Sequence, residues 1–380
     1  MQNAIAVPKS HILIKNISAF AKKNALMLIA FAAALITTFF VPIDAEYIGY
    51  FDFKTLSCLF CVLAVVCALR NQNFFYMLAG KLVQRFKTIR SATIALVYIT
   101  FIGSMLIAND MALLTFLPLG YLVLKTTAKE RYMAYVFILQ NIAANLGGML
   151  TPFGNPQNLY LYSHFSIPDG EFIKIMLVPF LLSVTLITVC CFFIRPEPIV
   201  QLENDISVPK AKTAILLALF ALSIAIVFRG IPYGLGLLVI PAVLLFVDRK
   251  ALSQVDYPLL LTFVFFFIFA GNMARVEPVR ELFSSLLEKN TLLFSVLSCQ
   301  CISNVPSAIL LSNFTGDYPS LLVGVNIGGV GTLISSLASL ITFREYSKNQ
   351  PGKTKAYIVM FSIINFAFLI VLTSLELVII

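Results

Sequence analysis

Long apolar runs recur along the chain from Ala25 to Ile380, and short segments rich in charge, proline or glycine separate them. A helix needs about 20 predominantly apolar residues to cross the hydrocarbon core of a bilayer. The pattern therefore predicts an all-α polytopic membrane protein. Nine runs are expected to cross the membrane: 25–41, 53–69, 131–165, 172–194, 212–229, 232–247, 257–273, 319–343 and 354–379.

Two other apolar segments carry a polar interruption. The first, 91–124, is interrupted at Ala108-Asn109-Asp110, and the second, 291–313, at Ser303-Asn304-Val305-Pro306. Each segment is expected to form a re-entrant hairpin that enters and leaves the membrane by one face. The interruptions are then the hairpin tips.

Two of the predicted crossings are expected to contain a broken helix. Within 131–165, the segment Thr151-Pro-Phe-Gly-Asn-Pro-Gln-Asn158 cannot stay helical, because its two prolines lack backbone donors and its glycine loosens the chain. Within 319–343, the break is expected in the small polar stretch from Gly331 to Ser339, which has no proline. Unwound backbone is tolerated at membrane depth only where protein buries it or where it lines a cavity.

Three landmarks occur twice in the same order. Asn145-Leu-Gly-Gly-Met-Leu-Thr151 matches Asn326-Ile-Gly-Gly-Val-Gly-Thr332 at an offset of 181 positions, and the tip asparagines and an aspartate before a long apolar run also recur. An odd number of predicted crossings separates the copies, so they are expected to be inverted repeats, an arrangement found in secondary transporters. The expected organisation is a cytoplasmic lead-in at 1–24, a first repeat at 25–194, a cytoplasmic linker at 195–211 and a second repeat at 212–380.

The net charge of +9 is best explained by membrane topology. With the N-terminus inside, most of the 27 Lys and Arg residues fall in segments predicted to face the cytoplasm. The hairpin interpretation of 91–124 fits this distribution better than a single crossing does. We therefore expect a multi-pass protein of a bacterial-type inner membrane, with a cytoplasmic N-terminus and an external C-terminus, and no nucleic-acid partner.

Composition and motifs narrow the functional class. Hydrophobic residues make up 59% of the chain and charged residues 12%, which excludes a soluble fold. There is no phosphate-binding loop of the G-x-x-x-x-G-K-[ST] type, so pumping is expected to use an ion gradient, and no cofactor is expected. An intramembrane aspartyl protease would need a second buried aspartate, whereas Asp317 is predicted in an outer loop. The chain is not expected to be an enzyme.

Asp110 is the one charged residue within 91–124, and a bare carboxylate at membrane depth costs at least about 2.5 kcal/mol on insertion scales. It is expected to bind Na⁺ or to carry a proton. The alternative is that Asp110 only caps the returning helix. No Lys or Arg lies in the hairpins or the breaks, so an anionic substrate would depend on helix N-termini, amides and hydroxyls.

The order of these motifs resembles the ion transporter superfamily over about residues 50–345. The Thr-Pro-x-Gly-Asn-Pro-x-Asn break is similar to that of the divalent-anion/sodium symporters and citrate permeases. The Ala-Asn-Asp tip is similar to that of the arsenite permease branch. The resemblance implies an elevator transporter, usually a homodimer, that moves a small anion, such as a di- or tricarboxylate, together with Na⁺ or H⁺. The alternative within the superfamily is arsenite or other metalloid efflux, or Na⁺/H⁺ antiport.

The resemblance and the residue types together assign the candidate site. The expected cation-binding residues are Asn109, Asp110, Thr151, Gly154, Ser303, Asn304 and Thr332. The expected substrate-binding residues are Asn109, Asp110, Asn155, Pro156, Asn158, Asn304, Val305, Ser335 and Ser336. No metal other than a coupling Na⁺ is expected.

Overall fold

The computed structural model describes residues 24–83, 85–199 and 208–379. Within these ranges the chain is helical and has no β-strand, with one isolated bridge between Thr88 and Pro198. The prediction of an all-α protein is confirmed. The expected lead-in, except for its last residue, and the centre of the expected linker lie outside the described residues.

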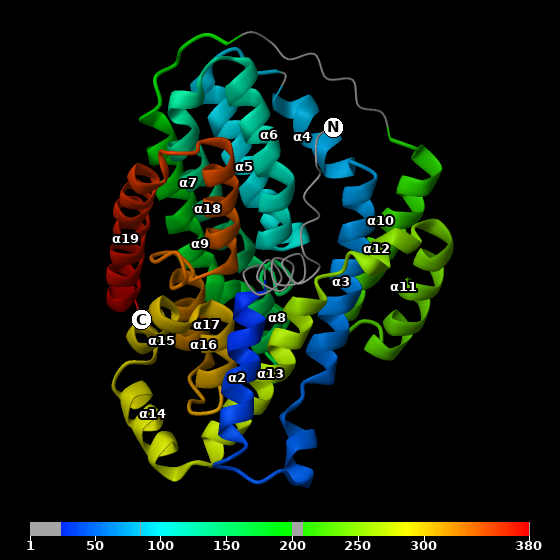
Figure 1. The fold of residues 1–380 in the computed structure, drawn as a ribbon, viewed down its shortest axis with the longest axis vertical. Coiled ribbons are helices and arrows are strands. Elements are labelled where there is room, and N and C mark those ends of the chain that lie inside the picture. Colours follow the sequence, from blue (N-terminus) through cyan, green and yellow to red (C-terminus); the bar gives the residue numbers. More distant parts are fainter. Residues whose placement is uncertain (1–23, 84, 200–207, 380) are drawn as a thin grey trace, which may run out of the picture.

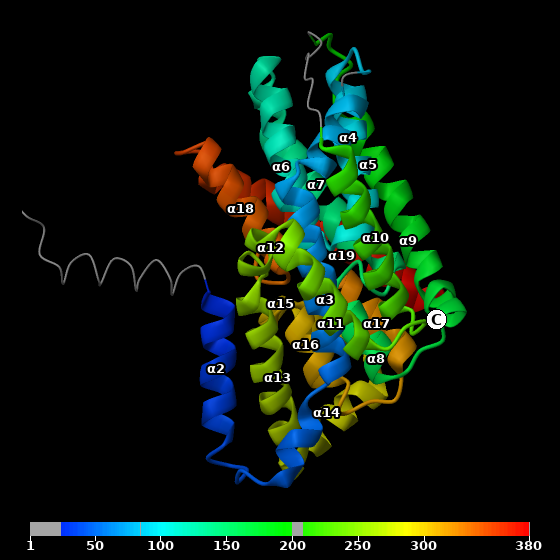
Figure 2. The same cartoon turned by 90° about the vertical axis from the view of Figure 1, so that its right-hand side faces the viewer.

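The helices follow one another along the chain with short connections (Figures 1 and 2). They are α2 (Ala25–Thr37), η1 (Ala45–Tyr50), α3 (Phe53–Asn71), α4 (Phe74–Val83), α5 (Ile89–Ile107), α6 (Asn109–Thr126), η2 (Glu130–Tyr132), α7 (Met133–Gly147), η3 (Gly148–Leu150), α8 (Pro156–His164), α9 (Asp169–Phe192), α10 (Lys210–Val227), α11 (Tyr233–Val247), α12 (Arg249–Ser253), α13 (Tyr257–Arg275), α14 (Glu277–Lys289), α15 (Thr291–Ile302), α16 (Asn304–Leu311), α17 (Tyr318–Ile327), α18 (Leu337–Asn349) and α19 (Thr354–Ile379).

In the described part of the chain, seven helical segments are long and apolar enough to span a bilayer: 53–71, 89–107, 130–150, 169–192, 210–227, 257–275 and 354–379. Two of the expected crossings form short helices: α2 stops four residues before the end of the run 25–41, whereas α11 fills all but the first residue of the run 232–247. Helix α2 has 13 residues and α11 has 15. At 1.5 Å per residue these helices are about 20 and 22 Å long, shorter than a hydrocarbon core of about 30 Å.

Two helical hairpins approach the middle of the molecule from opposite ends (Figures 1 and 2). Helices α5 and α6 come from the end that carries α4, and α15 and α16 from the end that carries α14. Ala108 and Ser303 reverse the chain with φ angles of +67° and +81°. Positive φ is uncommon for residues other than glycine and is tolerated where the surroundings hold it. Both hairpins therefore use the same strained reversal immediately before their tip asparagine.

The interrupted helices lie in the centre of the bundle. In the 130–150 segment 83% of the candidate span is buried, against 28% in α9 and 33% in α19. Between Gly148 and Pro156, and again between Ile327 and Leu337, the chain leaves the α-helical conformation. This burial places the non-helical backbone where its polar groups can find protein partners instead of lipid.

Packing contacts divide the helices into neighbouring groups. Helix α3 packs against α10, α11 and α12 on one side of the molecule, and α7 packs against α5, α6, α9, α18 and α19 on the other (Figure 1). Helices α2 and α13 pair closely, joined by a buried hydrogen bond of 3.1 Å from Asn272 Nδ2 to Thr37 Oγ1. At the end of this pair, the Arg275 guanidinium donates to both oxygens of Asp44, at 3.0 and 2.6 Å.

Candidate functional site

Each hairpin tip is fastened to one of the two non-helical segments. The backbone N–H of Asn109 donates to the carbonyl oxygen of Gly154 at 3.1 Å. The backbone N–H of Asn304 donates to the carbonyl oxygen of Ser335 at 2.9 Å. Gly154 and Ser335 are 181 positions apart, the offset that relates the two Asn-x-Gly-Gly motifs in the sequence. Corresponding positions of the repeat therefore make the same tip contact.

A threonine supports each tip in the same way. Thr151 Oγ1 donates to the carbonyl oxygen of Met105 at 2.7 Å, and Thr332 Oγ1 donates to that of Gln300 at 3.2 Å. Both acceptors lie three residues before the reversal at Ala108 or Ser303.

The tip asparagines also orient the first turns that follow them. Asn109 Oδ1 accepts from the backbone N–H of Asp110, and Asn304 Oδ1 from that of Val305, both at 2.9 Å. These bonds fix the asparagine side chains against the start of α6 and α16.

A buried network of side-chain amides joins the two interrupted helices. Asn326 Nδ2 on α17 donates to Asn158 Oδ1 on α8 at 2.6 Å. Asn326 Oδ1 accepts from Asn155 Nδ2 at 3.0 Å and from Gln157 Nε2 at 3.3 Å. Asn109 Nδ2 donates to Asn145 Oδ1 at 3.3 Å and extends the network to the first tip. Since buried amides are costly to leave unpaired, this network fixes the positions of α8 and α17 relative to each other.

A cavity of about 20 Å³ lies where the two tips meet. Its lining residues are Leu26, Asn109, Asp110, Pro156, Gln157, Leu259, Thr262, Ser303, Asn304, Val305 and Leu337. This volume accommodates about one water molecule or small ion. Helices α2 and α13 close one side of the cavity.

Four helices begin at this cavity. Their first residues, which all line it, are Asn109 of α6, Pro156 of α8, Asn304 of α16 and Leu337 of α18. A helix N-terminus carries a partial positive charge and unpaired N–H groups, which favour an anion. The arrangement supplies positive potential at a cavity whose lining, in the described part of the chain, has no Lys, Arg or His.

Among the described residues that line the cavity, Asp110 is the only charged one. Its Oδ1 atom is buried and has no hydrogen-bond partner in the described part of the chain. Helix α6 begins at Asn109, with Ala108 at the N-cap position and no side-chain cap. Among the described residues, Asp110 Oδ1 therefore makes no capping bond to the start of α6. Asp110 is partly buried, and a charge on its enclosed Oδ1 is costly unless it is neutralised.

The other candidate residues fall into two groups. Pro156, Ser303 and Val305 line the cavity together with the tip asparagines and Asp110. The second group supports the site through hydrogen bonds and does not line the cavity in this conformation: Thr151, Gly154, Asn155, Asn158, Thr332, Ser335 and Ser336. In that group Ser336 caps α18, accepting from the N–H of Ser339 at 3.2 Å.

Sequence reasoning missed several residues of this region. Gln157 lines the cavity and its Oε1 is buried without a donor in the described residues. It lies within 151–158, where the sequence predicts the break, although the structure places it in the first turn of α8, so its position could have indicated it. Gln300 braces the second tip by donating to the carbonyl oxygen of Gly328 at 2.9 Å. Away from the cavity, Glu376 on α19 is 2% exposed. Its charge within the last apolar run of the sequence could have indicated that it is an unusual buried residue.

Comparison with known proteins gives consistent matches over most of the chain. A sequence profile described as citrate transporter matches residues 17–319. An uncharacterized transporter of Methanocaldococcus jannaschii is 31% identical over 299 residues, which cover 78% of this chain and 82% of that protein. The inner membrane protein YbiR of Escherichia coli is 30% identical over 318 residues, which cover 81% of this chain and 84% of that protein.

Proposed function

Because the chain belongs to the citrate transporter family, and is therefore a multi-pass membrane transporter and not an enzyme, we propose that it is a secondary active transporter for a small anion. The proposed substrate is a di- or tricarboxylate, and the proposed coupling ion is Na⁺ or H⁺. No cofactor takes part.

One observation carries this proposal: four helix N-termini surround a cavity in which Asp110 is the single charged side chain among the residues that the structure describes. The N-termini favour a carboxylate group, whereas Asp110 alone would repel it. A coupled cation or proton at Asp110 removes that repulsion. Anion binding then becomes favourable only when the coupling ion is also present, which is the thermodynamic requirement for symport.

The proposed coupling site combines the Asp110 carboxylate with neutral oxygens. Gln157 Oε1 is a second buried acceptor without a donor among the described residues, and it lines the same cavity. Carboxylate and amide oxygens suit a hard cation such as Na⁺, and the carboxylate alone suits a proton.

Movement is required for a carboxylate to reach this site, because the cavity holds about 20 Å³ and Leu26 of α2 and Leu259 of α13 cover it. We propose an elevator mechanism in which both hairpins and both interrupted helices move as one inverted-repeat unit. The matched tip contacts fasten each hairpin to the interrupted helix of its own half, and the buried amide network joins the two halves, so together they support a common unit.

We also propose a homodimer and an inner-membrane location with a cytoplasmic N-terminus and an external C-terminus. An elevator needs a fixed scaffold, and the exposed apolar helices outside the hairpins can supply dimer contacts. Mass photometry of the protein in native-like nanodiscs tests whether it is a homodimer. A particle with the mass of one chain that still transports would contradict it.

A second candidate function has its own support. The small cavity and the negative side chain of Asp110 fit a cation or proton without any anion, which favours Na⁺/H⁺ antiport within the same fold. Efflux of arsenite or another metalloid is the remaining alternative within the same superfamily.

Flux into proteoliposomes tests these functions. Purified protein is reconstituted, and uptake of citrate, succinate and arsenite is followed under an imposed Na⁺ gradient or pH gradient. Carboxylate uptake that requires one of the gradients supports the proposal. Exchange of Na⁺ for H⁺ without any carboxylate supports the antiport alternative and contradicts anion symport.

A further inference from the structure

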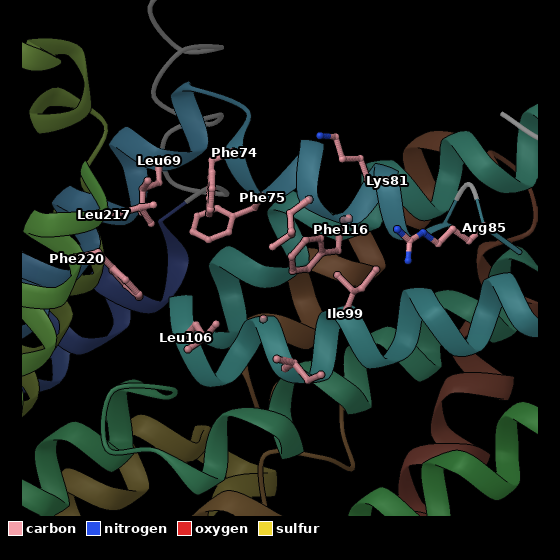
Figure 3. Close-up of a pocket in the computed structure, with 14 residues that line it drawn as sticks. Leu69, Phe74, Phe75, Lys81, Arg85, Ile99, Leu106, Phe116, Leu217 and Phe220 are labelled. Atoms are coloured by element: carbon pink, nitrogen blue, oxygen red, sulfur yellow. The ribbon is translucent and has the colours of Figure 1, made fainter. Parts of the chain in front are cut away.

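A large apolar groove lies between α4 and the outer face of the first hairpin (Figure 3). It is separate from the small cavity where the two hairpin tips meet. Its volume is about 670 Å³. The walls come from the end of α3, from α4, from the hairpin arms α5 and α6, and from α10. A groove of this size falls within the usual range of about 300–1,000 Å³ for small-molecule sites.

The walls are apolar along most of the groove. Phe75 of α4, Ile99 of α5 and Phe116 of α6 face one another across it, and Phe220 of α10 lies at one end (Figure 3). Ile102 and Leu106 on α5 line the groove and are 55% and 42% exposed. Because α5 is a candidate membrane span, this exposure opens the groove toward the lipid phase.

Two basic side chains lie at the end of the groove opposite Phe220. They are Lys81 of α4 and Arg85, which follows that helix (Figure 3). Both side chains are exposed, and neither has an ion-pair partner among the described residues. The sequence contains no Asp or Glu between Asp52 and Asp110, and none in α10. The one acidic residue of the helices that build the groove, Asp110 of α6, lines the cavity at the hairpin tips and not the groove, so no acidic residue of these helices lines the groove beside Lys81 and Arg85.

We propose that this groove binds an anionic phospholipid. Its phosphate is held by Lys81 and Arg85, and an acyl chain lies along the apolar wall formed by α4, α5 and α6. The combination of a cationic end with an apolar, laterally open groove matches the two parts of such a lipid. A dicarboxylate would leave the apolar wall unused, and an uncharged lipid would leave both cations unused.

The location gives the bound lipid a contact with two groups of helices. Phe116 belongs to the first hairpin, whereas Leu217 and Phe220 belong to α10, which packs on α3. The ring of Phe116 also lies directly over Gly103, where an added Cβ would come within 2.4 Å of it. An acyl chain in the groove would therefore touch the hairpin that carries Asn109 and the neighbouring α3–α10 pair at once.

Native mass spectrometry of the delipidated full-length protein tests the proposal. The protein is titrated with phosphatidylglycerol and with phosphatidylcholine that carry identical acyl chains. We expect wild-type protein to bind phosphatidylglycerol in preference. The double variant Lys81→Gln/Arg85→Gln should weaken phosphatidylglycerol binding roughly 30-fold, from about 1 kcal/mol for each basic residue. Phosphatidylcholine binding should not change.

Lys87→Gln is the matched control, because Lys87 is an exposed cation of the same connection that does not line the groove. It should retain the preference for phosphatidylglycerol. A wall variant, Ile102→Trp/Leu106→Trp, should reduce binding of both lipids by filling the groove. A further measurement on wild-type protein needs no variant: raising the salt concentration should weaken phosphatidylglycerol binding more than phosphatidylcholine binding.

The proposal is overturned if the wild-type protein binds both lipids equally, or if Lys81→Gln/Arg85→Gln binds phosphatidylglycerol as the wild type does. Displacement of the lipid by inorganic phosphate at equal concentration would also overturn it, because the acyl chain would then add nothing. Loss of a dimer in Ile102→Trp/Leu106→Trp, with lipid binding intact, would assign the groove to a second copy of the chain instead.

Discussion

Asn326 on α17 donates its side-chain amide to Asn158 Oδ1 on α8 at 2.6 Å, and both side chains are buried. The two residues are 168 positions apart in the sequence. Asn326 Oδ1 accepts from Asn155 and Gln157 at the same time, so this one side chain bonds three polar residues of the first interrupted helix. The hydrogen bonds explain how two short helices with non-helical ends remain in place at the centre of the bundle.

Replacing Asn326 with leucine should lower the free energy of unfolding by about 1–3 kcal/mol, because buried groups on Asn155, Asn158 and Gln157 lose their partner. Thermal unfolding of the purified protein in detergent measures the loss. Thr185→Val is the control, since its hydroxyl bonds only the carbonyl oxygen of Leu181 in its own exposed helix face. Equal melting temperatures for Asn326→Leu and Thr185→Val would contradict the structural role of the network.

Thr151→Val and Thr332→Val should have matching effects, because each removes the hydroxyl that supports one hairpin tip. Each change should lower the free energy of unfolding by about 1 kcal/mol, the net contribution of a typical hydrogen bond. Transport should also slow in both variants as the tips loosen. Thermal unfolding and proteoliposome flux check the two effects. A loss confined to one variant would show that the two tips are supported differently.

The general class of this fold could be predicted from the sequence because apolar runs report directly on burial in lipid. The non-helical segment before Pro156 was also accessible, since proline removes a backbone donor for a local reason. The second segment, from Gly328 to Ser336, has no proline, and small polar residues gave only an indirect indication. The same local inference overestimated the length of α2, which ends at Thr37 and not at Val41, because hydrophobicity does not fix where a helix ends.

The covering of the cavity could not be predicted. Leu26 and Thr262 reach it because α2 packs against α13, and that pairing depends on tertiary contacts between distant segments. The role of Asn326 was hidden for a similar reason. Its motif was visible as a repeat, but the sequence does not show that its amide bonds the opposite half.

Glu197 should make stability depend on acid pH. Hydrogen bonds from Lys129, Tyr132 and Arg131 lower the pKa of this carboxyl to about 2. Its unfolded pKa is about 4.3. The folded pKa is depressed, so the stabilisation is complete above the unfolded value and is lost as the pH falls from about 4.3 toward 2.

The melting temperature of Glu197→Gln, measured between pH 7 and pH 2.5, checks this behaviour. The variant should melt below the wild type at pH 7, and the difference should shrink on acidification. A difference that is constant over this range would show that Glu197 does not titrate in this way.

The two hairpins should open to opposite faces of the membrane. Thr126 at the end of α6 is expected in the cytoplasm and Gly316 between α16 and α17 outside. Cysteines at these positions, in a Cys301→Ser background that removes the exposed native thiol, can be labelled in right-side-out and inverted vesicles. Gly316→Cys should be tolerated, because nothing lies within 4 Å of an added Cβ. Labelling of both positions from the same side would contradict the inverted arrangement.

The central claim is that Asp110 carries the coupling ion, and flux through Asp110→Asn in proteoliposomes tests it most directly. The substitution keeps the side-chain shape but removes the charge and the titratable group. Asp317→Asn is the matched control, because Asp317 caps α17 outside the cavity and an amide oxygen can replace its bond to the N–H of Ser320. Both variants should fold and enter the membrane normally. We predict that Asp110→Asn abolishes gradient-driven flux, or removes its Na⁺ or pH dependence, while Asp317→Asn transports as the wild type does. Wild-type coupled flux in Asp110→Asn at normal expression would contradict the account.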